Sequence, residues 1–230
     1  MDDLDLFEQK IGFTFVNKDL LLQAFTHRSY LNENPKFRVA HNERLEFLGD
    51  AVIELVITEY LFDKYPERPE GELTSFRAAL VNADMLASVA SALDFNSYIL
   101  LSRGEKKDIG KARMYILANT FEAFVGALYL DQGYRAAHEF LGEVLMPRIE
   151  DIVSKKLWKD PKSMFQEEAQ ERLGITPAYK VLKEEGPDHQ KRFLVGIYLG
   201  EELIAEGEGS SKQEAEVVAA GRGLEAKRWN

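Results

Sequence analysis

The sequence contains no cysteine, which excludes a disulfide framework and any thiolate metal site. Long apolar runs are also missing, because even ILANTFEAFVGALYL (116–130) is interrupted by Asn119 and Glu122, and a membrane span takes roughly 18 residues. The first ten residues, MDDLDLFEQK, have neither the basic nor the apolar segment of a secretion signal. We therefore expect a protein of the reducing cytoplasm that makes no contact with a membrane.

Familiar catalytic and nucleotide-binding motifs are missing as well. The four histidines show no metal-ligand spacing, and neither a GxSxG motif nor a Cys–His pair indicates nucleophilic catalysis. The segment GEKKDIGK (104–111) has five residues between its glycines where the Walker phosphate loop has four, and Ala112 follows it in place of Ser or Thr. We expect no nucleotide cofactor, and we interpret this segment as a solvated connection or as a basic loop beside nucleic-acid phosphates.

An excess of basic residues, the usual first sign of nucleic-acid binding, is absent too. The net charge is −10. Through Trp158 there are 18 basic and 25 acidic residues, a net charge of −7, and from Lys159 onward there are 11 and 14, a net charge of −3. Any binding to nucleic acid must therefore depend on where the basic residues lie, with the carboxylates elsewhere or masked by a metal ion.

What the sequence does contain is a helical first part and a mixed second part. Up to about residue 156 the apolar residues recur with a helical period, which predicts helices over 41–65, 74–93, 113–131 and 134–156, with Gly133 ending the third. Strand-like alternation is absent from this part. We predict an all-α domain over residues 1–156.

The pattern changes after WKDPK (158–162). A helical segment, SMFQEEAQERLG, is followed by three strand-like runs, AYKVLKEEG, KRFLVGIYLG and ELIAEGEG, and then by a second helical segment, SSKQEAEVVAAGRGLEAK. Gly186 and Gly200 fall at the turns between the runs. We predict a small α+β domain of α-β-β-β-α order over residues 160–229, with an antiparallel sheet and both helices on one face.

The predicted helix that begins at HNERLEFLGD (41–50) carries charge in an unexpected place. Glu43, Glu46 and Asp50 recur at i, i+3 and i+7, on one face of a helix that is apolar in nearly every other direction. A second apolar helix repeats the feature, since Glu122 is the only charged residue of FEAFVGALYL and Asn119 stands one turn before it. Isolated buried carboxylates are costly, so a cation must lie opposite them.

Two interpretations of this charge remain open for any single residue. One glutamate at a helix crossing is more often part of a salt bridge or a cap, and Glu54, one turn beyond Asp50, is best interpreted as solvated or paired with another helix. Four or five oxygen donors from two helices instead favour Mg²⁺ or Mn²⁺, which prefer such ligands and keep several waters. A metal held this way activates water for attack on a phosphodiester.

Four stretches carry a resemblance to a known family: THRSY (26–30), HNERLEFLGDAV (41–52), PEGELTSFRAALVNADMLA (69–87) and FEAFVGALYLDQG (121–133). In this order they resemble the ribonuclease III family, and the resemblance extends over essentially the whole chain. It implies a dimeric endonuclease specific for double-stranded RNA, with one acidic cluster per subunit. Glu46, Asp50 and Glu122 match the family's central metal-binding and catalytic carboxylates, with Asp50 and Glu122 indispensable, and Glu43 and Glu70 match secondary positions of its active valley.

One position departs from the family pattern. Asn119 stands where most members have Asp, one turn before Glu122. An amide oxygen still coordinates Mg²⁺ but contributes no formal charge, so we predict an active site with a raised Mg²⁺ requirement.

The second part resembles a double-stranded-RNA-binding domain. In that family, residues of the first helix and of the first strand turn contact 2′-hydroxyls in successive minor grooves, and the start of the last helix contacts phosphates across the major groove. Gln213 and Glu216 replace basic residues of the pattern, which predicts weaker phosphate binding, with Lys180, Lys191 and Arg192 as compensating residues. The residues implied to bind RNA are Gln166, Glu167, Gln170, Pro187, His189, Ser210, Ser211 and Lys212.

The resemblance implies a Mg²⁺-dependent enzyme that cuts both strands of duplex RNA, leaves 5′-phosphate and 3′-hydroxyl ends, and processes ribosomal precursor and structured messenger RNAs as a homodimer. The alternative is an RNA-binding or ribosome-associated protein of the same fold whose catalysis has lapsed, which Asn119, Gln213 and Glu216 favour. The retained carboxylates argue against it, because a binding protein has no physical reason to keep uncompensated charge between apolar helices.

Overall fold

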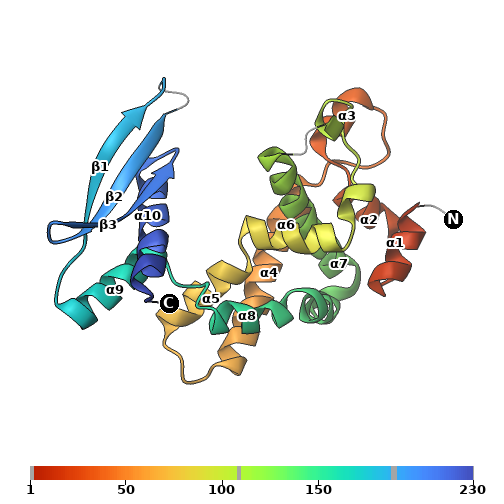
Figure 1. Ribbon diagram of the computed structural model, residues 1–230. Coiled ribbons are helices and arrows are strands. Elements are labelled where there is room, and N and C mark those ends of the chain that lie inside the picture. The colour runs from red at the N-terminus through yellow and green to blue at the C-terminus, as the bar shows by residue number, and fades with distance from the viewer. Residues whose placement is uncertain (1–2, 108–109, 188–190, 230) are drawn as a thin grey trace. The chain divides into compact units, whose positions relative to one another are not determined.

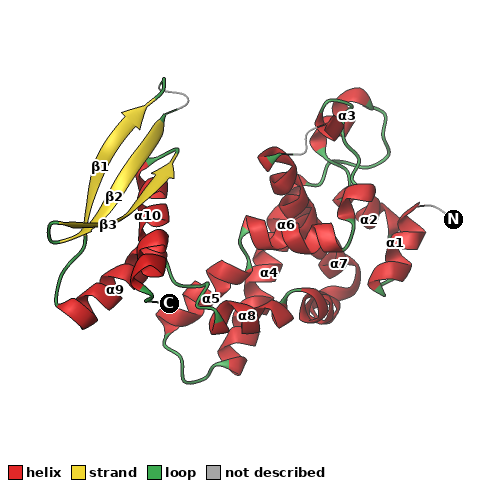
Figure 2. Ribbon diagram, viewed as in Figure 1, coloured by secondary structure: helices red, strands yellow, loops and turns green. Residues whose placement is uncertain are grey.

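The computed structural model describes residues 3–107, 110–187 and 191–229. The chain forms two compact units, Met1–Trp158 and Lys159–Asn230. Helices and short 3-10 turns make up the first unit, whereas the second has the order α-β-β-β-α (Figures 1 and 2). The fold class predicted from the sequence is confirmed.

Eight α-helices are described in the first unit. They are α1 (Asp3–Ile11), α2 (Lys18–Ala24), α3 (Arg28–Glu33), α4 (Glu43–Lys64), α5 (Glu70–Leu80), α6 (Ala83–Ala92), α7 (Lys111–Val144) and α8 (Ile149–Ser154). Three 3-10 turns lie between them: η1 (Phe95–Ser97), η2 (Glu105–Lys107) and η3 (Met146–Arg148).

The core of the first unit is built from aromatic side chains around the long helices α4 and α7. Phe7 is fully buried, and its ring centroid lies 4.9 Å from that of Phe25, 5.3 Å from that of Phe95 and 5.6 Å from that of Phe124, with the rings edge to face. Such pairs add to the stability that their large buried area provides. The core thus fixes α7 against the N-terminal helices and holds it in place beneath α4.

Two helix predictions need correction. The segment 74–93 is not one helix, because it divides into α5 and α6 at Asn82, whose side-chain oxygen accepts a hydrogen bond from the backbone N–H of Met85 and so caps α6. The segment 134–156 is likewise divided, since Pro147 in η3 interrupts it before α8. The break predicted at Gly133 is confirmed, with a non-helical φ of 83° there inside α7.

The second unit comprises α9 (Pro161–Leu173), β1 (Ala178–Glu185), β2 (Arg192–Leu199), β3 (Glu202–Gly209) and α10 (Lys212–Lys227). The strands form an antiparallel sheet in the order β1-β2-β3, with Val181 opposite Val195 and Val195 opposite Gly207. Phe165 of α9, Ile197 of β2 and Ala219 of α10 share one buried cluster. Both helices therefore cover the same face of the sheet, as the sequence predicts.

Capping residues explain where the helices of the second unit begin and end. Asp160 accepts a hydrogen bond from the backbone N–H of Ser163 ahead of Pro161, the first residue of α9. Gly174, with a φ of 68°, ends the same helix. Ser211 caps α10 by accepting from the backbone N–H of Glu214.

None of the helices within the described ranges combines the length and the apolar character needed to cross a membrane.

Candidate active site

The candidate site lies where α4 crosses α7, and two glycines determine how closely the helices approach. A Cβ on Gly49 would stand 1.7 Å from the backbone oxygen of Glu122, and a Cβ on Gly126 would stand 2.2 Å from the backbone oxygen of Leu45. No larger side chain fits at either position without moving a backbone. The close approach at Gly49 and Gly126 therefore brings the stretch of α4 that carries Glu46 and Asp50 to the stretch of α7 that carries Glu122.

The crossing brings the four predicted side chains into one cluster. Asn119 forms a side-chain hydrogen bond with Glu46, which favours the charged form of that carboxyl, but burial and then the charge of Glu43 outweigh it and raise the pKa of Glu46. Asp50, which is exposed, acts electrostatically on both Glu46 and Glu122. The polar faces of α4 and α7 therefore lie next to each other, as the sequence predicts.

Glu122 is the most strongly perturbed member. Burial raises the pKa of its carboxyl to about 7, and the nearby charges of Asp50 and Glu46 act in the same direction. Within the described part of the chain, no ion pair reaches Glu46, Asp50 or Glu122. The cluster therefore carries negative charge that no described side chain neutralises through an ion pair.

The donor set suits a hard divalent cation, but it is not a closed cage. All four groups offer oxygen, and neither His nor Cys takes part. Among the described residues, no three or more His, Cys, Asp or Glu side chains are placed so that they alone could hold a metal ion. Mg²⁺ does not require such a cage, since it keeps several waters and binds through one or two carboxylates plus substrate phosphate. These residues therefore suit Mg²⁺, which keeps several of its waters, better than an ion that must exchange all its waters for protein ligands.

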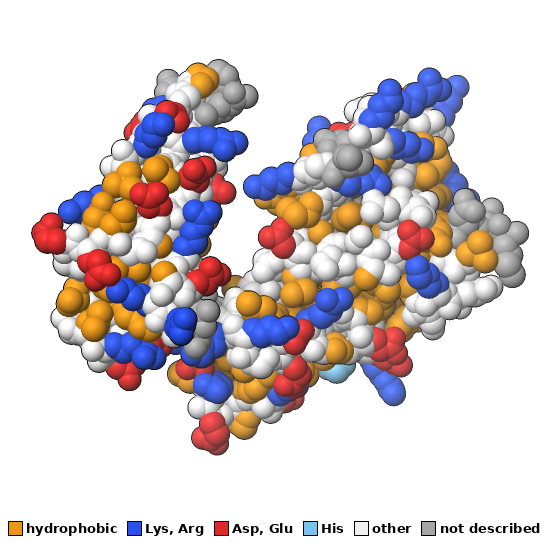
Figure 3. Space-filling view, in the orientation of Figure 1, with side chains coloured by type: hydrophobic (Ala, Val, Ile, Leu, Met, Phe, Trp, Pro, Cys, Tyr) orange, Lys and Arg blue, Asp and Glu red, His pale blue; other side chains and the backbone are white. Residues whose placement is uncertain are grey.

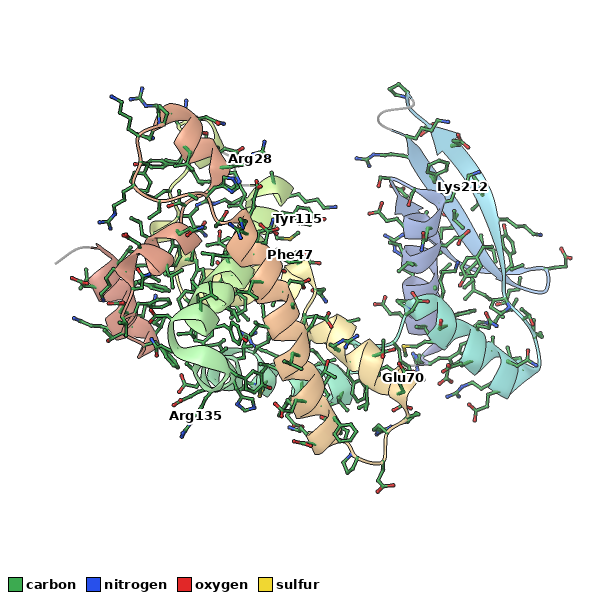
Figure 4. The ribbon with its side chains drawn as sticks, turned by 180° about the vertical axis from the view of Figure 1, so that it is seen from behind. Arg28, Phe47, Glu70, Tyr115, Arg135 and Lys212 are labelled. Atoms are coloured by element: carbon green, nitrogen blue, oxygen red, sulfur yellow. The ribbon has the colours of Figure 1, made fainter. Side chains whose placement is uncertain are left out.

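The two secondary positions differ in their placement. Glu43 lies beside the cluster, where its carboxylate is 3.5 Å from the guanidinium of Arg28 and 3.7 Å from the ring of His41. Glu70 instead begins α5, accepts a hydrogen bond from the hydroxyl of Thr74, and lies away from the crossing (Figure 4). Within one chain, the structure brings Glu43 to the cluster and leaves Glu70 apart from it.

Glu54, one turn beyond Asp50 on α4, has the ordinary role that the sequence predicted. Its carboxylate is 2.9 Å from the guanidinium of Arg77 on α5, whose guanidinium also donates to the hydroxyl of Thr58. Glu54 therefore ties α4 to α5 and does not belong to the cluster of unpaired carboxylates at the crossing.

Two exposed aromatic residues near the cluster were missed by the sequence analysis. Phe47 is 82% exposed although it lies within the apolar helix α4, and Tyr115, one turn before Asn119 on α7, is 46% exposed. Figure 4 labels both beside Arg28 at the same end of the unit. The spacing of Tyr115, Asn119 and Glu122 at i, i+4 and i+7 was the available signal, because it places all three on one helix face.

The RNA-binding residues predicted in the second unit lie at its surface. Gln166, Glu167 and Gln170 are exposed on α9, and Pro187 is exposed after β1. Ser210, Ser211 and Lys212 are exposed at the start of α10, whereas His189 lies outside the described residues.

The predicted compensating lysines of this unit already have partners. The amine of Lys191 is 2.8 Å from a carboxylate oxygen of Glu184, and that of Lys180 lies 4.7 Å from the centre of the Tyr198 ring. Glu216, which replaces a basic residue of the family pattern, pairs at 2.5 Å with Lys162 and joins α10 to α9. This ion pair gives Glu216 a structural role that the sequence analysis missed.

Comparison with known families agrees with this geometry. A family model described as ribonuclease-III-like matches residues 17–149, and a double-stranded RNA binding motif matches residues 161–226. Ribonuclease 3 of Enterococcus faecalis is 45% identical over 219 residues, which is 95% of this chain and 95% of that protein. Ribonuclease 3 of Bacillus cereus is 46% identical over 219 residues, which is 95% of this chain and 89% of that one.

A solved structure matches the helical unit. The nuclease domain of ribonuclease III from Campylobacter jejuni is 38% identical, with a TM-score of 0.57, and the match covers 63% of this chain and 99% of that domain. The acidic cluster lies within the part matched by the nuclease family model, and the α-β-β-β-α unit contains the RNA-binding motif. The chain therefore belongs to the ribonuclease III family.

Proposed function

We propose that this protein is a Mg²⁺-dependent endoribonuclease that hydrolyses both strands of duplex RNA and leaves 5′-phosphate and 3′-hydroxyl ends. The observation that carries the proposal is the cluster of uncompensated carboxylates at the crossing of α4 and α7, in a chain that also has a double-stranded RNA binding motif. Ribosomal precursor and structured messenger RNAs are the proposed substrates, and the cytoplasm is the proposed site of action.

Four side chains would hold the metal: Glu46, Asp50, Asn119 and Glu122. A bound Mg²⁺, or Mn²⁺ in its place, supplies an activated water and stabilises the developing charge at phosphorus. The amide of Asn119 orients the carboxylate of Glu46 through their hydrogen bond. In the metal-free chain, burial and the charges of Asp50 and Glu46 raise the pKa of the Glu122 carboxyl to about 7, and a bound cation would favour its charged form. We propose Asp50 and Glu122 as the indispensable pair.

RNA recognition is proposed to depend on shape rather than sequence, through 2′-hydroxyl and phosphate contacts. Gln166, Glu167, Gln170, Pro187, His189, Ser210, Ser211 and Lys212 are the proposed contacts. Local basic surface answers the objection raised by the net charge: Figure 3 shows Lys and Arg side chains gathered over the end of the helical unit that carries α3, where Arg28, Lys36, Arg38 and Arg103 are exposed. Phosphates can approach there despite the acidic composition.

A homodimer is proposed, with one cluster per subunit and one strand cut by each. Three large apolar side chains of α4 are exposed, Phe47 by 82%, Leu55 by 58% and Phe62 by 69%, and their spacing places them on one helix face. A Campylobacter jejuni nuclease domain has a region described as involved in dimer formation. Glu43 and Glu70 are proposed to line the valley between the subunits. A monomer in light scattering at micromolar concentration would contradict the shared-valley mechanism.

The decisive experiment separates cleavage from binding. Labelled duplex RNA is incubated with wild type and Asp50→Asn, first in Mg²⁺ and then in Ca²⁺. We expect wild type to cleave in Mg²⁺ and Asp50→Asn to bind equally well in Ca²⁺ but to cleave about a thousandfold more slowly, which corresponds to roughly 4 kcal/mol of lost stabilisation. Glu54→Gln is the matched control, because that carboxylate is already paired with Arg77, and it should retain near-normal cleavage.

The second candidate function is that of a duplex-RNA-binding or ribosome-associated protein with lapsed catalysis. Asn119 and Gln213 favour it, whereas Glu216 no longer does, because its pairing with Lys162 accounts for an acidic residue there. Binding without cleavage by wild type in both Mg²⁺ and Mn²⁺ would establish this candidate in place of the enzyme.

A further inference from the structure

Tyr115 is an exposed aromatic residue that the proposed mechanism does not use. It is 46% exposed, whereas Ile116, Leu117 and Ala118, which follow it on α7, are buried. Among the described residues its hydroxyl forms no hydrogen bond. A large amphipathic ring at the surface beside an acidic cluster calls for a partner, because a tyrosine offers both an apolar face and a polar tip.

Helix geometry places this ring close to the reaction. Tyr115 precedes Asn119 by four residues and Glu122 by seven, so all three lie on one face, and its Cα is about 6 Å along the axis from that of Asn119 and about 10 Å from that of Glu122. Nucleotides of one strand advance by about 3.4 Å each in B-form DNA, and a duplex of RNA advances on the same scale. If a strand runs along this face of α7 with its phosphodiester at the cluster, a neighbouring nucleotide falls within reach of Tyr115.

The charges around the cluster explain why such a contact is needed. The proposed Mg²⁺ would offset the charge of Glu46 and Asp50 only at the cluster itself, and the nearby guanidinium of Arg28 already pairs with Glu43. The amine of Lys111 lies 6.0 Å from the centre of the Tyr115 ring. The Lys111 amine offers a positive charge and the Tyr115 hydroxyl offers a hydrogen-bond donor. Acidic side chains can offer neither of these to an RNA backbone.

We propose that Tyr115 is a substrate-positioning residue whose hydroxyl donates a hydrogen bond to a ribose 2′-hydroxyl next to the scissile phosphodiester, with Lys111 supporting the same contact from across the ring. The 2′-hydroxyl is the group by which a protein distinguishes RNA from DNA at a given position. Tyr115 therefore contributes to the selection of RNA at the cut site as well as to its alignment. This inference rests on the proposed function, because it needs the bond to be cut at the cluster.

A double-substitution experiment on protein and RNA tests the contact. Wild type and Tyr115→Phe, as full chains, are given a set of otherwise identical RNA duplexes, each with one 2′-deoxy nucleotide within a few positions of the cut. The dissociation constant in Ca²⁺ and kcat/KM in Mg²⁺ are both measured. We expect Tyr115→Phe to weaken kcat/KM about fivefold to tenfold on unmodified RNA, the usual size of one hydrogen bond. At one position, a 2′-deoxy nucleotide should lower the kcat/KM of wild type by the same factor, and it should not lower the kcat/KM of Tyr115→Phe any further.

Tyr134→Phe is the matched control, since Tyr134 is also on α7 but its hydroxyl is bonded to Glu59, and it should behave as wild type on every duplex. Equal losses in wild type and Tyr115→Phe at every 2′-deoxy position would overturn the inference. A loss of the dimer by Tyr115→Phe in light scattering would also overturn it, by assigning the ring to an interface between subunits. The failures are distinguishable: wild type that binds duplex RNA but does not cleave it refutes the proposed function, whereas wild type that cleaves without the coupling to Tyr115 refutes only this contact.

Discussion

The crossing of α4 and α7 and the second unit treat their half-buried carboxylates in opposite ways. In the helical unit, no ion pair among the described residues reaches Glu46, Asp50 or Glu122, although Glu46 and Glu122 are half-buried. In the second unit, the half-buried carboxylates of Glu168 and Glu216 pair with Arg172 and Lys162, and exposed Glu167, Glu184 and Glu202 pair with Lys159, Lys191 and Lys227.

The difference separates charge that supports the fold from charge that supports chemistry. Paired charges at a surface contribute at most about 1 kcal/mol each and mainly fix local geometry. Unpaired, partly buried carboxylates lower the stability of the folded chain, as the raised pKa of Glu122 indicates. A protein retains such a cost where a ligand offsets it, which identifies the helical crossing, and not the more highly charged surface of the second unit, as the place for a cation.

The largest effect is expected from removing the crossing itself. Gly49→Ala puts a Cβ against the backbone of Glu122, so the helices must separate, and this should lower the free energy of unfolding by about 1–3 kcal/mol and abolish cleavage. Gly71→Ala is the control, because nothing lies within 4 Å of a Cβ there, and it should leave both quantities nearly unchanged. Chemical denaturation and a cleavage assay measure the two effects. Normal cleavage by Gly49→Ala would show that the close crossing is not required.

The second prediction concerns one more negative charge in the cluster of unpaired carboxylates. Asn119→Asp should lower the Mg²⁺ concentration for half-maximal cleavage about fivefold to tenfold, since one more unit charge near the ion is worth roughly 1 kcal/mol even in a water-like medium. Without metal, the same change should lower the melting temperature, because the new carboxylate repels Glu46 where the amide now forms a hydrogen bond with it. Mg²⁺ titrations of cleavage and of melting temperature measure both effects. An unchanged half-maximal concentration would refute our account of Asn119.

The third prediction concerns pH. The pKa of Glu122 rises from 4.5 to about 7 on folding, so the folded chain holds this proton more tightly than the unfolded one does. The contribution of Glu122 to the free energy of unfolding is therefore fully present below pH 4.5, and it is lost as pH rises from about 4.5 to about 7. We expect the metal-free melting temperature to fall by a few degrees across this window relative to Glu122→Gln, which keeps a neutral side chain throughout. If the melting temperatures of the two proteins changed with pH by the same amount, the raised pKa of Glu122 would be contradicted.

The smallest effect is expected in the second unit. Lys212→Ala should weaken duplex RNA binding a few-fold and reduce the slope of log affinity against log salt by about 1, because one phosphate contact is lost. Lys162→Ala is the control: that amine is paired with Glu216, so RNA binding should not change. Binding curves at several salt concentrations test the pair. If both substitutions weakened RNA binding equally, the ion pair with Glu216 would not set Lys162 apart from an RNA-binding lysine.

Some features of the fold were predictable because they depend on residues close in sequence. The strand turns followed from Gly186 and Gly200, whose φ values are 91° and 63°, and the break in α7 followed from Gly133. The division between α5 and α6 was missed, although Asn82 is a good capping residue, because the apolar period continues across it. Periodicity reports which residues are buried and does not by itself report where a helix is capped.

The candidate site was predictable only in part, for a similar reason. Helical spacing identified Glu46, Asp50, Asn119 and Glu122, because charge on an otherwise apolar helix is visible in one sequence. Their catalytic and metal-binding roles stay predictions, as do those of Glu43 and Glu70. Helical spacing also places Tyr115 on the face of Asn119 and Glu122, but the exposure of Phe47 and the pairing of Glu216 with Lys162 could not be predicted, since each depends on which elements lie nearby in space.

The sequence by itself determined the helical character of the first part, the α-β-β-β-α order of the second and the identity of the oxygen donors, since these depend on local propensity and helical spacing. Only the tertiary structure decided how those donors meet. The approach of Gly49 and Gly126 brings together residues some seventy positions apart, and it determines that Glu122, not Glu54, shares the unpaired charge. Burial and electrostatic coupling act through space, and for that reason the chain order of the carboxylates could not reveal which of them would be left without a partner.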